Sequence, residues 1–174
     1  MQKRIAFLAG LIFTLTLLAA CRGGKPSPAA SASCDLGGGK TIKTDYSSPR
    51  AKGRKIYGGL VPFGEVWRTG ANAATTFVTS SDVVVDGKTV TAGSYTIFTV
   101  PTADNWTLIV NKKTGEWGIP YKYESDELAR VDMKVSKLPS PVENFIIAYE
   151  NSGSGCTMNI DWEATRASVA ITAK

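Results

Sequence analysis

Short runs of alternating apolar and polar residues dominate the chain from about residue 34 onward. In residues 130–135 the Val, Met and Val side chains fall on one face and the charged side chains on the other, and residues 158–163 repeat this alternation. A period of two places successive side chains on opposite faces of a strand, so both runs predict half-buried strands. Residues 145–149, Phe-Ile-Ile-Ala-Tyr, are apolar at alternate positions and at the positions between them. They therefore predict a strand covered on both faces.

Further short segments with the composition of strands follow one another between turn residues. They are 42–46, 75–79, 83–85, 88–91, 95–100, 106–110 and 168–172. Asp86-Gly87 lies between two apolar runs and predicts a tight hairpin. No amphipathic helix of three turns can be drawn, although residues 126–129 suit a short turn. The pattern therefore predicts an all-β fold, a single antiparallel β-sandwich over residues 34–174, of which the jelly roll is one form.

The first twenty residues have the layout of a cleaved signal peptide. Lys3 and Arg4 precede an apolar run, and the run ends in Leu-Ala-Ala before Cys21. This ending resembles the bacterial lipoprotein signal, in which the cysteine is lipidated and becomes the new first residue. The alternative is a membrane-spanning anchor, but the run is short for a bilayer core of about 30 Å and no stop-transfer charges follow it.

Residues 21–33 predict a flexible tether between the lipid and the domain, because Gly, Pro, Ser and Ala leave little to bury. We therefore expect the protein to be attached to a membrane through the lipid on Cys21. Arg22, rather than Asp, follows the cysteine. That choice resembles lipoproteins sent to the outer membrane, so we expect a protein that faces the periplasm.

The charge balance and the residue composition exclude several classes of function. The chain has 20 basic and 15 acidic residues, and loss of Lys3 and Arg4 leaves 18 against 15. These charges are scattered, with no basic run longer than Lys112-Lys113, so we expect neither a nucleic-acid stripe nor a polybasic membrane patch. The chain has no histidine, which excludes the usual Ser-His-Asp and Cys-His sites and histidine-ligated metals. The acids are dispersed and form no calcium-loop motif, so no metal or cofactor is expected.

Two cysteines remain once Cys21 is set aside for lipidation. In an exported protein, Cys34 and Cys156 predict a disulfide that closes a loop of about 120 residues. The alternative is a catalytic thiol, which would lack its usual imidazole partner.

Residues 53–72, Gly-Arg-Lys-Ile-Tyr-Gly-Gly-Leu-Val-Pro-Phe-Gly-Glu-Val-Trp-Arg-Thr-Gly-Ala-Asn, are dense in glycine, aromatic and charged residues and have no clean period. Together with residues 92–101, residues 106–111 and Trp117-Gly118, they resemble the bacterial exported proteins catalogued as domain of unknown function 2911. The similarity runs from about Ile42 to Thr172. The family pattern has a glutamate after the asparagine, where this chain has Ala73. The resemblance implies an exported, mostly β domain and brings no activity with it.

The same segment supplies most of the candidate ligand-binding residues. The arginines offer planar forks for carboxylate or phosphate, the aromatic rings offer flat apolar faces, and the amide both donates and accepts. The candidates are Arg54, Glu65, Trp67, Arg68 and Asn72, with Trp117 and Tyr121 from a later loop. The alternative is a structural framework, in which Trp67 belongs to the core and Arg68 pairs with Asp161 or Glu163.

These features favour a non-catalytic, lipid-anchored binding module for a small polar ligand, a glycan or an envelope partner. A second hypothesis is a periplasmic hydrolase that uses carboxylates, with Glu65 as the first candidate and Asp161 and Glu163 as possible partners. A third is a passive structural lipoprotein. The oligomeric state cannot be inferred from the residues.

Overall fold

The computed structural model describes residues 27–153 and 155–174. The predicted signal peptide of residues 1–20 and the predicted lipidation site at Cys21 lie outside the described residues and stay predictions. In the described part, strands form one nine-stranded sheet and the remaining regular structure is a single 3₁₀ turn, η1 (Glu124–Asp126). The strands are β1 (Ala29–Gly37), β2 (Lys40–Ser47), β3 (Thr75–Thr79), β4 (Val83–Val85), β5 (Lys88–Val90), β6 (Gly93–Pro101), β7 (Asn105–Asn111), β8 (Glu127–Ser152) and β9 (Gly155–Ala173).

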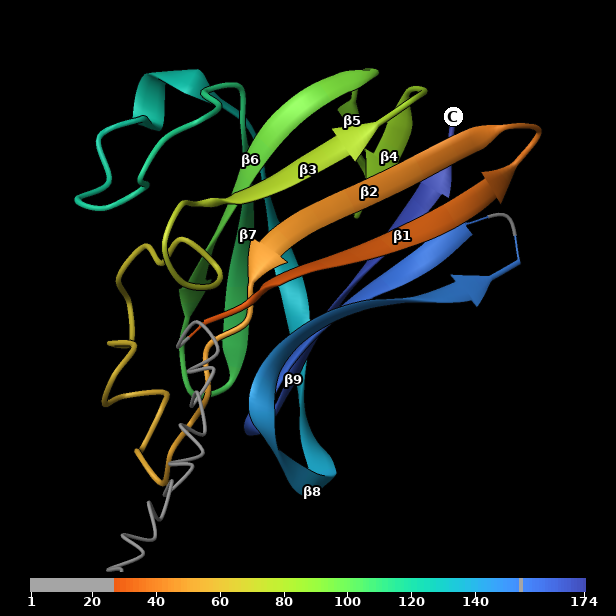
Figure 1. Cartoon of the computed structure of the whole chain (residues 1–174). Coiled ribbons are helices and arrows are strands. Elements are labelled where there is room, and N and C mark those ends of the chain that lie inside the picture. Colours follow the sequence, from red (N-terminus) through yellow and green to blue (C-terminus); the bar gives the residue numbers. More distant parts are fainter. Residues whose placement is uncertain (1–26, 154) are drawn as a thin grey trace, which may run out of the picture.

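Every strand pair in the sheet is antiparallel, which confirms the predicted all-β antiparallel class. The order across the sheet is β1-β2-β3-β6-β7-β8-β9-β4-β5. The long strands β8 and β9 bend sharply (Figure 1), and β1 at the sheet edge also lies against both of them. One curled sheet thus supplies both layers of the sandwich. No helix among the described residues is long and apolar enough to span a bilayer.

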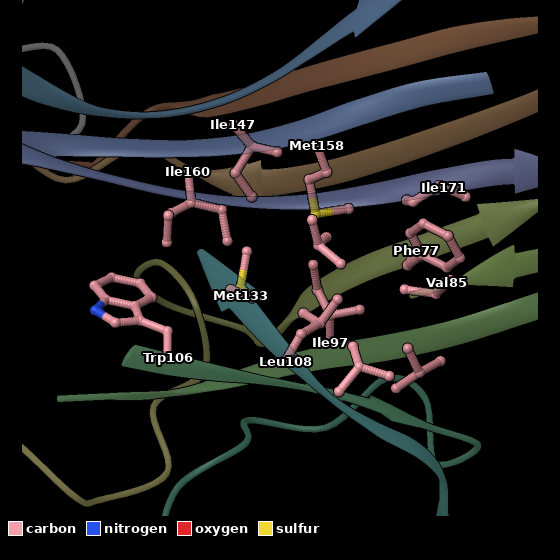
Figure 2. Packing of buried hydrophobic residues seen from close by; sticks show 14 of the residues in the cluster. Phe77, Val85, Ile97, Trp106, Leu108, Met133, Ile147, Met158, Ile160 and Ile171 are labelled. Carbon is pink, nitrogen blue, oxygen red and sulfur yellow. The ribbon is translucent and has the colours of Figure 1, made fainter. Parts of the chain in front are cut away.

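The core lies between these layers, and residues 130–135 follow the predicted alternation, with Arg130, Asp132 and Lys134 exposed. Residues 158–163 do not, because Asn159 and Asp161 are also buried, so this part of β9 is covered on both faces. Figure 2 shows Met133 on β8 and Met158 and Ile160 on β9 among the buried side chains, and Trp162 on β9 is buried as well. The prediction for residues 145–149 is wrong in one respect. Ile146 is 37% exposed, so this part of β8 is covered on one face only.

In two places, two strands that were predicted separately are parts of one longer strand. Residues 130–135 and 145–149 both belong to β8, and residues 158–163 and 168–172 both belong to β9. Pro139 and Pro141 separate the two halves of β8 in the sequence. Proline cannot donate to a ladder, so it is accommodated at a bulge. The β8–β9 register shifts there, between Lys137 and Val142.

Strand β1 begins inside the segment predicted to be a tether. Residues 29–33 pair with β2, with Ala29 opposite Ser47, so the flexible tether cannot extend to residue 33. Small Ala and Ser side chains gave no apolar alternation to reveal this strand. The folded domain starts earlier than expected.

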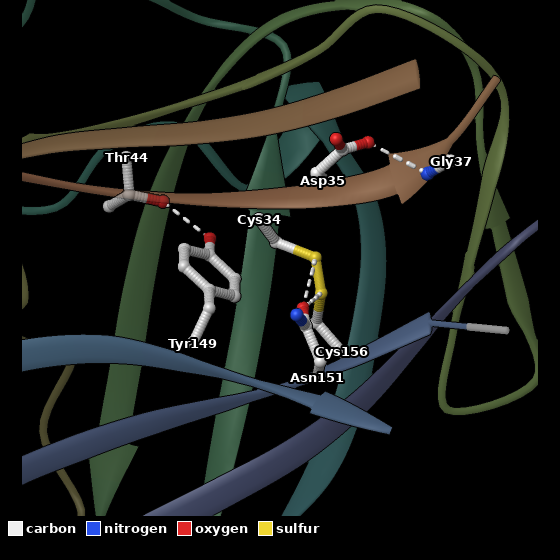
Figure 3. The surroundings of a disulfide bond; sticks show 7 residues. All are labelled: Cys34, Asp35, Gly37, Thr44, Tyr149, Asn151 and Cys156. Carbon is white, nitrogen blue, oxygen red and sulfur yellow. Dashed lines mark hydrogen bonds between the residues drawn. A yellow bond between two sulfur atoms is a disulfide. The ribbon is translucent and has the colours of Figure 1, made fainter. Parts of the chain in front are cut away.

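The predicted hairpin and disulfide are both confirmed. Asp86 and Gly87 have positive φ angles of 41° and 79° between β4 and β5. Cys34 on β1 and Cys156 on β9 are joined, with their Cα atoms 6.5 Å apart and 122 residues apart in the sequence. Figure 3 shows Asn151 beside this disulfide, with its side-chain oxygen 3.5 Å from Cys156 Sγ. The bond fastens the edge strand β1 to the opposite layer.

Candidate functional site

Two loops on one side of the sheet form the site (Figure 1), and together we call them the loop end: residues 48–74 between β2 and β3, and residues 112–123 after β7. Backbone hydrogen bonds fasten the first loop to the sheet. Trp67 exchanges two with Thr99 on β6, at 2.8 and 2.9 Å, and Phe145 on β8 donates one to Pro49 at 2.8 Å. This loop is therefore an ordered part of the fold.

Thr69 holds a left-handed backbone conformation, with φ at 56°. A β-branched residue rarely adopts it, so the surroundings must impose it. Thr69 is fully buried, its hydroxyl lies 3.1 Å from that of Thr99, and its carbonyl accepts a 2.6 Å hydrogen bond from the Thr75 hydroxyl. These contacts fix the course of the chain between Arg68 and Gly70, which both line the cavity described below.

The second loop packs on the first through Gly118. A Cβ atom there would lie 2.8 Å from Ala74 Cβ and 3.1 Å from Arg68 Cβ, so only glycine permits this approach. The preceding residue, Trp117, is 59% exposed. Its ring lies 4.9 Å below the Arg68 guanidinium carbon, and its carbonyl accepts a 3.3 Å hydrogen bond from Arg68 Nη1. Arg68 thus connects the two loops.

A cavity of about 490 Å³ opens between the loops and the sheet, and we call it the basic cavity. Four of its lining side chains are cationic and none is a carboxylate. The rest of its wall is mainly apolar. The lining residues are Ser27, Pro49, Arg50, Lys52, Arg54, Leu60, Val61, Trp67, Arg68, Gly70, Ala71, Ile119 and Trp162.

An aromatic cluster supports the wall of the basic cavity. Trp67 stacks on Trp162 with centroids 6.0 Å apart and an interplanar angle of 17°. Phe145 and Tyr57 meet Trp67 edge-on at 5.2 and 6.2 Å. The indole N–H of Trp67 donates to the Gly70 carbonyl at 3.2 Å. Trp67 is therefore both part of the core packing and part of the cavity wall, so the two interpretations of this residue are compatible.

The predicted framework pairing of Arg68 is wrong. Within the part of the chain that the structure describes, Arg68 has no carboxylate partner. Asp161 instead accepts two hydrogen bonds from Arg166, at 2.8 and 2.7 Å, and Glu163 accepts one from the backbone of Ile56 at 3.4 Å. Burial without a counter-ion lowers the pKa of the half-buried Arg68 guanidinium.

Arg54 reaches the same cavity but is more constrained. Its Nε donates to the Ala51 carbonyl at 2.9 Å, and its Nη2 donates to the Arg50 carbonyl at 2.6 Å. These bonds close the turn that carries Lys52, whose φ is 51°. The two arginines singled out from the sequence therefore line one cavity, as Arg50 and Lys52 also do.

A second cavity, of about 460 Å³, adjoins the first and shares Leu60, Val61, Trp67 and Ile119 with it. Glu65 and Tyr121 line this second cavity and not the basic one. The Tyr121 hydroxyl donates to Glu127 at 2.7 Å. Burial raises the pKa of Tyr121, and the bond to Glu127 raises it further.

The other predicted residues lie beside the basic cavity. Asn72 is exposed and donates to the Ser47 hydroxyl at 3.2 Å and to the Ser27 carbonyl at 3.4 Å. Trp117 contributes through Arg68. Arg50, Lys52 and Trp162 also line the cavity but were not predicted from the sequence. Arg50 and Lys52 precede the distinctive segment, and the strand pattern placed Trp162 in the core.

The described residues contain no cluster of three or more acidic, histidine or cysteine side chains that could hold a metal ion. The carboxylates considered for hydrolysis are also dispersed. Glu65 lines the second cavity, Asp161 is paired with Arg166, and Glu163 lines a shallower cavity beside Glu143. None of the three cavities described is lined by two of these three carboxylates.

A family model described as protein of unknown function (DUF2911) matches residues 27–171. The chain belongs to this family. The DUF2911 match includes all the residues that line the basic cavity, from Ser27 to Trp162. No curated protein and no solved structure matches the chain.

Proposed function

We propose that this DUF2911 protein is a lipid-anchored protein of the cell envelope whose basic cavity binds a small anionic ligand with an apolar part. One observation carries the proposal. Arg50, Lys52, Arg54 and Arg68 line a cavity with aromatic walls that has no carboxylate in its lining. Its volume of about 490 Å³ falls within the range of small-molecule sites.

The charge balance explains why an anion suits this cavity. A half-buried cation without a counter-ion has lost part of its hydration and gained no partner in return. A carboxylate or phosphate placed beside Arg68 would accept charge-assisted hydrogen bonds from the guanidinium fork. The stacked indoles of Trp67 and Trp162 would contact the apolar part of the ligand.

The envelope location rests on other observations. The first twenty residues have the layout of a signal peptide, and Cys21 ends a lipoprotein-type motif. The Cys34–Cys156 disulfide supports an oxidising compartment. The proposed sorting to the outer membrane is supported only by Arg22, the residue that follows Cys21.

The alternatives have less support. A carboxylate hydrolase needs two acids on one cavity at a defined separation. Glu65, Asp161 and Glu163 do not share a cavity, although Glu124 lines the second cavity with Glu65 and Glu143 lines a third with Glu163. A passive structural lipoprotein gives no reason to keep around a cavity four cations that have no acidic partner among residues 27–153 and 155–174. A binding module accounts for both facts.

Titration calorimetry of the mature protein with three compounds that share one phenyl ring tests the proposal. Phenylacetate, phenylacetamide and phenethylamine differ in charge and little in shape. We expect the anion to bind, and Arg68→Met to weaken it by about tenfold, the effect of one lost charge-assisted contact. The matched control is Arg130→Met, because Arg130 is paired with Glu127 outside the cavity. Equal binding of all three compounds, or no binding of any, contradicts the proposal.

A further inference from the structure

The described chain begins at the wall of the basic cavity. Ser27 is one of the lining residues, and its carbonyl accepts a hydrogen bond from the Asn72 side chain at 3.4 Å. The next carbonyl, that of Pro28, accepts a 2.8 Å hydrogen bond from the backbone of Ser48. The point at which the chain enters the domain is therefore fixed beside the cavity by two contacts with the first loop.

Few residues separate this point from the proposed lipid. Cys21 precedes Ser27 by six positions. Six residues span at most about 20 Å when fully extended, and a flexible segment of that length spans about 13 Å root-mean-square. An anchor at Cys21 would hold Ser27, at the wall of the basic cavity, within that distance of the bilayer surface. The tether predicted from the sequence was longer, because it included residues that form β1.

Exposed apolar side chains gather at the loop end. Leu60 and Ile119, at 47% and 41% exposure, line both the basic cavity and its neighbour. Trp117 lies beside Arg68, and Phe63 lies over Gly58 in the same first loop. These four account for most of the exposed large apolar residues of the described chain; the other two are Leu128 and Ile146. Aromatic and aliphatic side chains next to cations are typical of surfaces that enter the headgroup region of a membrane.

We propose that the loop end docks on the membrane that holds the anchor, and that the basic cavity receives the phosphate headgroup of an anionic phospholipid. The inference rests on the proposed function and names its ligand class. The guanidinium fork of Arg68 suits a phosphate, and Arg54 adds positive charge while its Nε and Nη2 hold the turn. Leu60, Trp117 and Ile119 contact the boundary between headgroups and acyl chains. Each cation near an anionic surface strengthens binding by about fivefold. The anchor makes docking intramolecular, so weak contacts suffice.

Tryptophan fluorescence of the mature lipoprotein, reconstituted through its own anchor, tests this docking. The vesicles contain phosphatidylcholine alone or with phosphatidylglycerol, and the acyl chains carry bromine, which quenches nearby indoles. We expect strong quenching only with phosphatidylglycerol. Trp117→Phe should remove most of it, because Trp106 and Trp162 are buried and Trp67 is partly buried in the cavity wall. Equal quenching in both vesicles, or none in either, overturns the inference.

A matched pair of lysine variants tests the role of the cavity. Lys52→Gln should raise the fraction of phosphatidylglycerol needed for half-maximal quenching, since one cation contributes about fivefold. Lys134→Gln, on the exposed side of β8 and outside the basic cavity, should leave it unchanged. Equal effects of the two variants would show that overall charge, and not the cavity, attracts the lipid, and would overturn the assignment.

Experiments with soluble ligands distinguish a failure of the membrane docking from a failure of the proposed anion site, on which the docking rests. Binding of phenylacetate without quenching by brominated lipid leaves the anion site standing and removes the membrane docking. Binding of glycerol phosphate to the protein in phosphatidylcholine vesicles, with no response to phosphatidylglycerol, identifies a free phosphate ester as the ligand and likewise overturns docking. Loss of both phenylacetate binding and quenching removes the proposed function itself. Mass spectrometry of the mature protein checks the acylation of Cys21.

Discussion

Two arginines of this molecule have opposite surroundings. Arg166 on β9 donates to both carboxylate oxygens of Asp161, at 2.8 and 2.7 Å, and to Glu150 at 3.3 Å. The hydrogen bond to Asp161 raises the pKa of Arg166. Arg68 at the loop end has an indole ring and a carbonyl oxygen but no described carboxylate, and burial lowers its pKa. Arg166, on the ribbon formed by β8 and β9, thus has its counter-ions within the fold, whereas Arg68 at the loop end has none among the described residues.

This difference separates stability from binding. Internal partners contribute to folding, while an unpaired cation in a cavity contributes little to folding and is available to a ligand. Substitutions on the ribbon should therefore change the free energy of unfolding with little change in affinity. Substitutions at the loop end should do the reverse.

The largest effect is expected at the disulfide, which fastens β1 to the ribbon. Replacing Cys34 and Cys156 together with Ala should lower the free energy of unfolding by up to about 5 kcal/mol, since the bond closes a loop of 122 residues. Urea unfolding with and without reductant measures the loss. Phenylacetate affinity of the folded variant should stay within about twofold of wild type. A variant that is as stable as wild type would show that the bond does not stabilise the ribbon.

Arg166→Met should have the next largest effect. It leaves Asp161, which is only 7% exposed, without its counter-ion, and breaking such a pair costs about 3 kcal/mol. Denaturant unfolding measures this cost. A loss below about 0.5 kcal/mol would show that the pair is no stronger than an exposed one and would weaken the contrast between the two arginines.

Arg68→Met tests the contrast between the paired Arg166 and the unpaired Arg68 directly. Because no described carboxylate is left unpaired, we expect the free energy of unfolding to change by less than about 0.5 kcal/mol in either direction. The same unfolding experiment compares it with Arg166→Met. A loss as large as that of Arg166→Met would make Arg68 a structural residue of the loop end.

The smallest effect is expected in the pH dependence of stability, at the ion pair between Glu127 and Arg130. The hydrogen bond from Arg130 lowers the pKa of Glu127, and the Tyr121 hydroxyl lowers it further, although burial opposes both. A lowered folded pKa contributes stability that is present above the unfolded value of about 4.5 and is lost as the pH falls through the folded value. Glu127→Gln should therefore flatten the dependence of the melting temperature on pH below about 4.5. An unchanged slope would exclude this pair as its source.

The fold was largely predictable from the period of two in the strands. Residues 75–79 and 83–85 are strands with the predicted bounds. Strand β1 was missed because its Ala and Ser side chains show no contrast in hydrophobicity. The continuity of β8 was not predicted: residues 130–135 and 145–149 were expected as separate strands, although a bulge accommodates the two prolines between them.

The site was only half predictable. Residue chemistry identified Arg54, Trp67 and Arg68, because arginine forks beside indoles are unusual in a plain strand. It could not place Arg50 and Lys52 beside them, since cations separated along the chain meet only after the first loop folds. Four of the basic residues described as scattered in the sequence therefore line one cavity. The partner of Asp161 was also unpredictable, because it depends on the irregular register near Glu163, whose φ is 53°.

The bond between Cys34 and Cys156 has one more consequence. Both loops of the loop end lie between these two residues in the sequence. A protease that cuts either loop once would therefore produce two pieces that remain covalently joined through this bond. Under the proposed anchoring at Cys21, a single cut in either loop would not release the rest of the domain from the membrane.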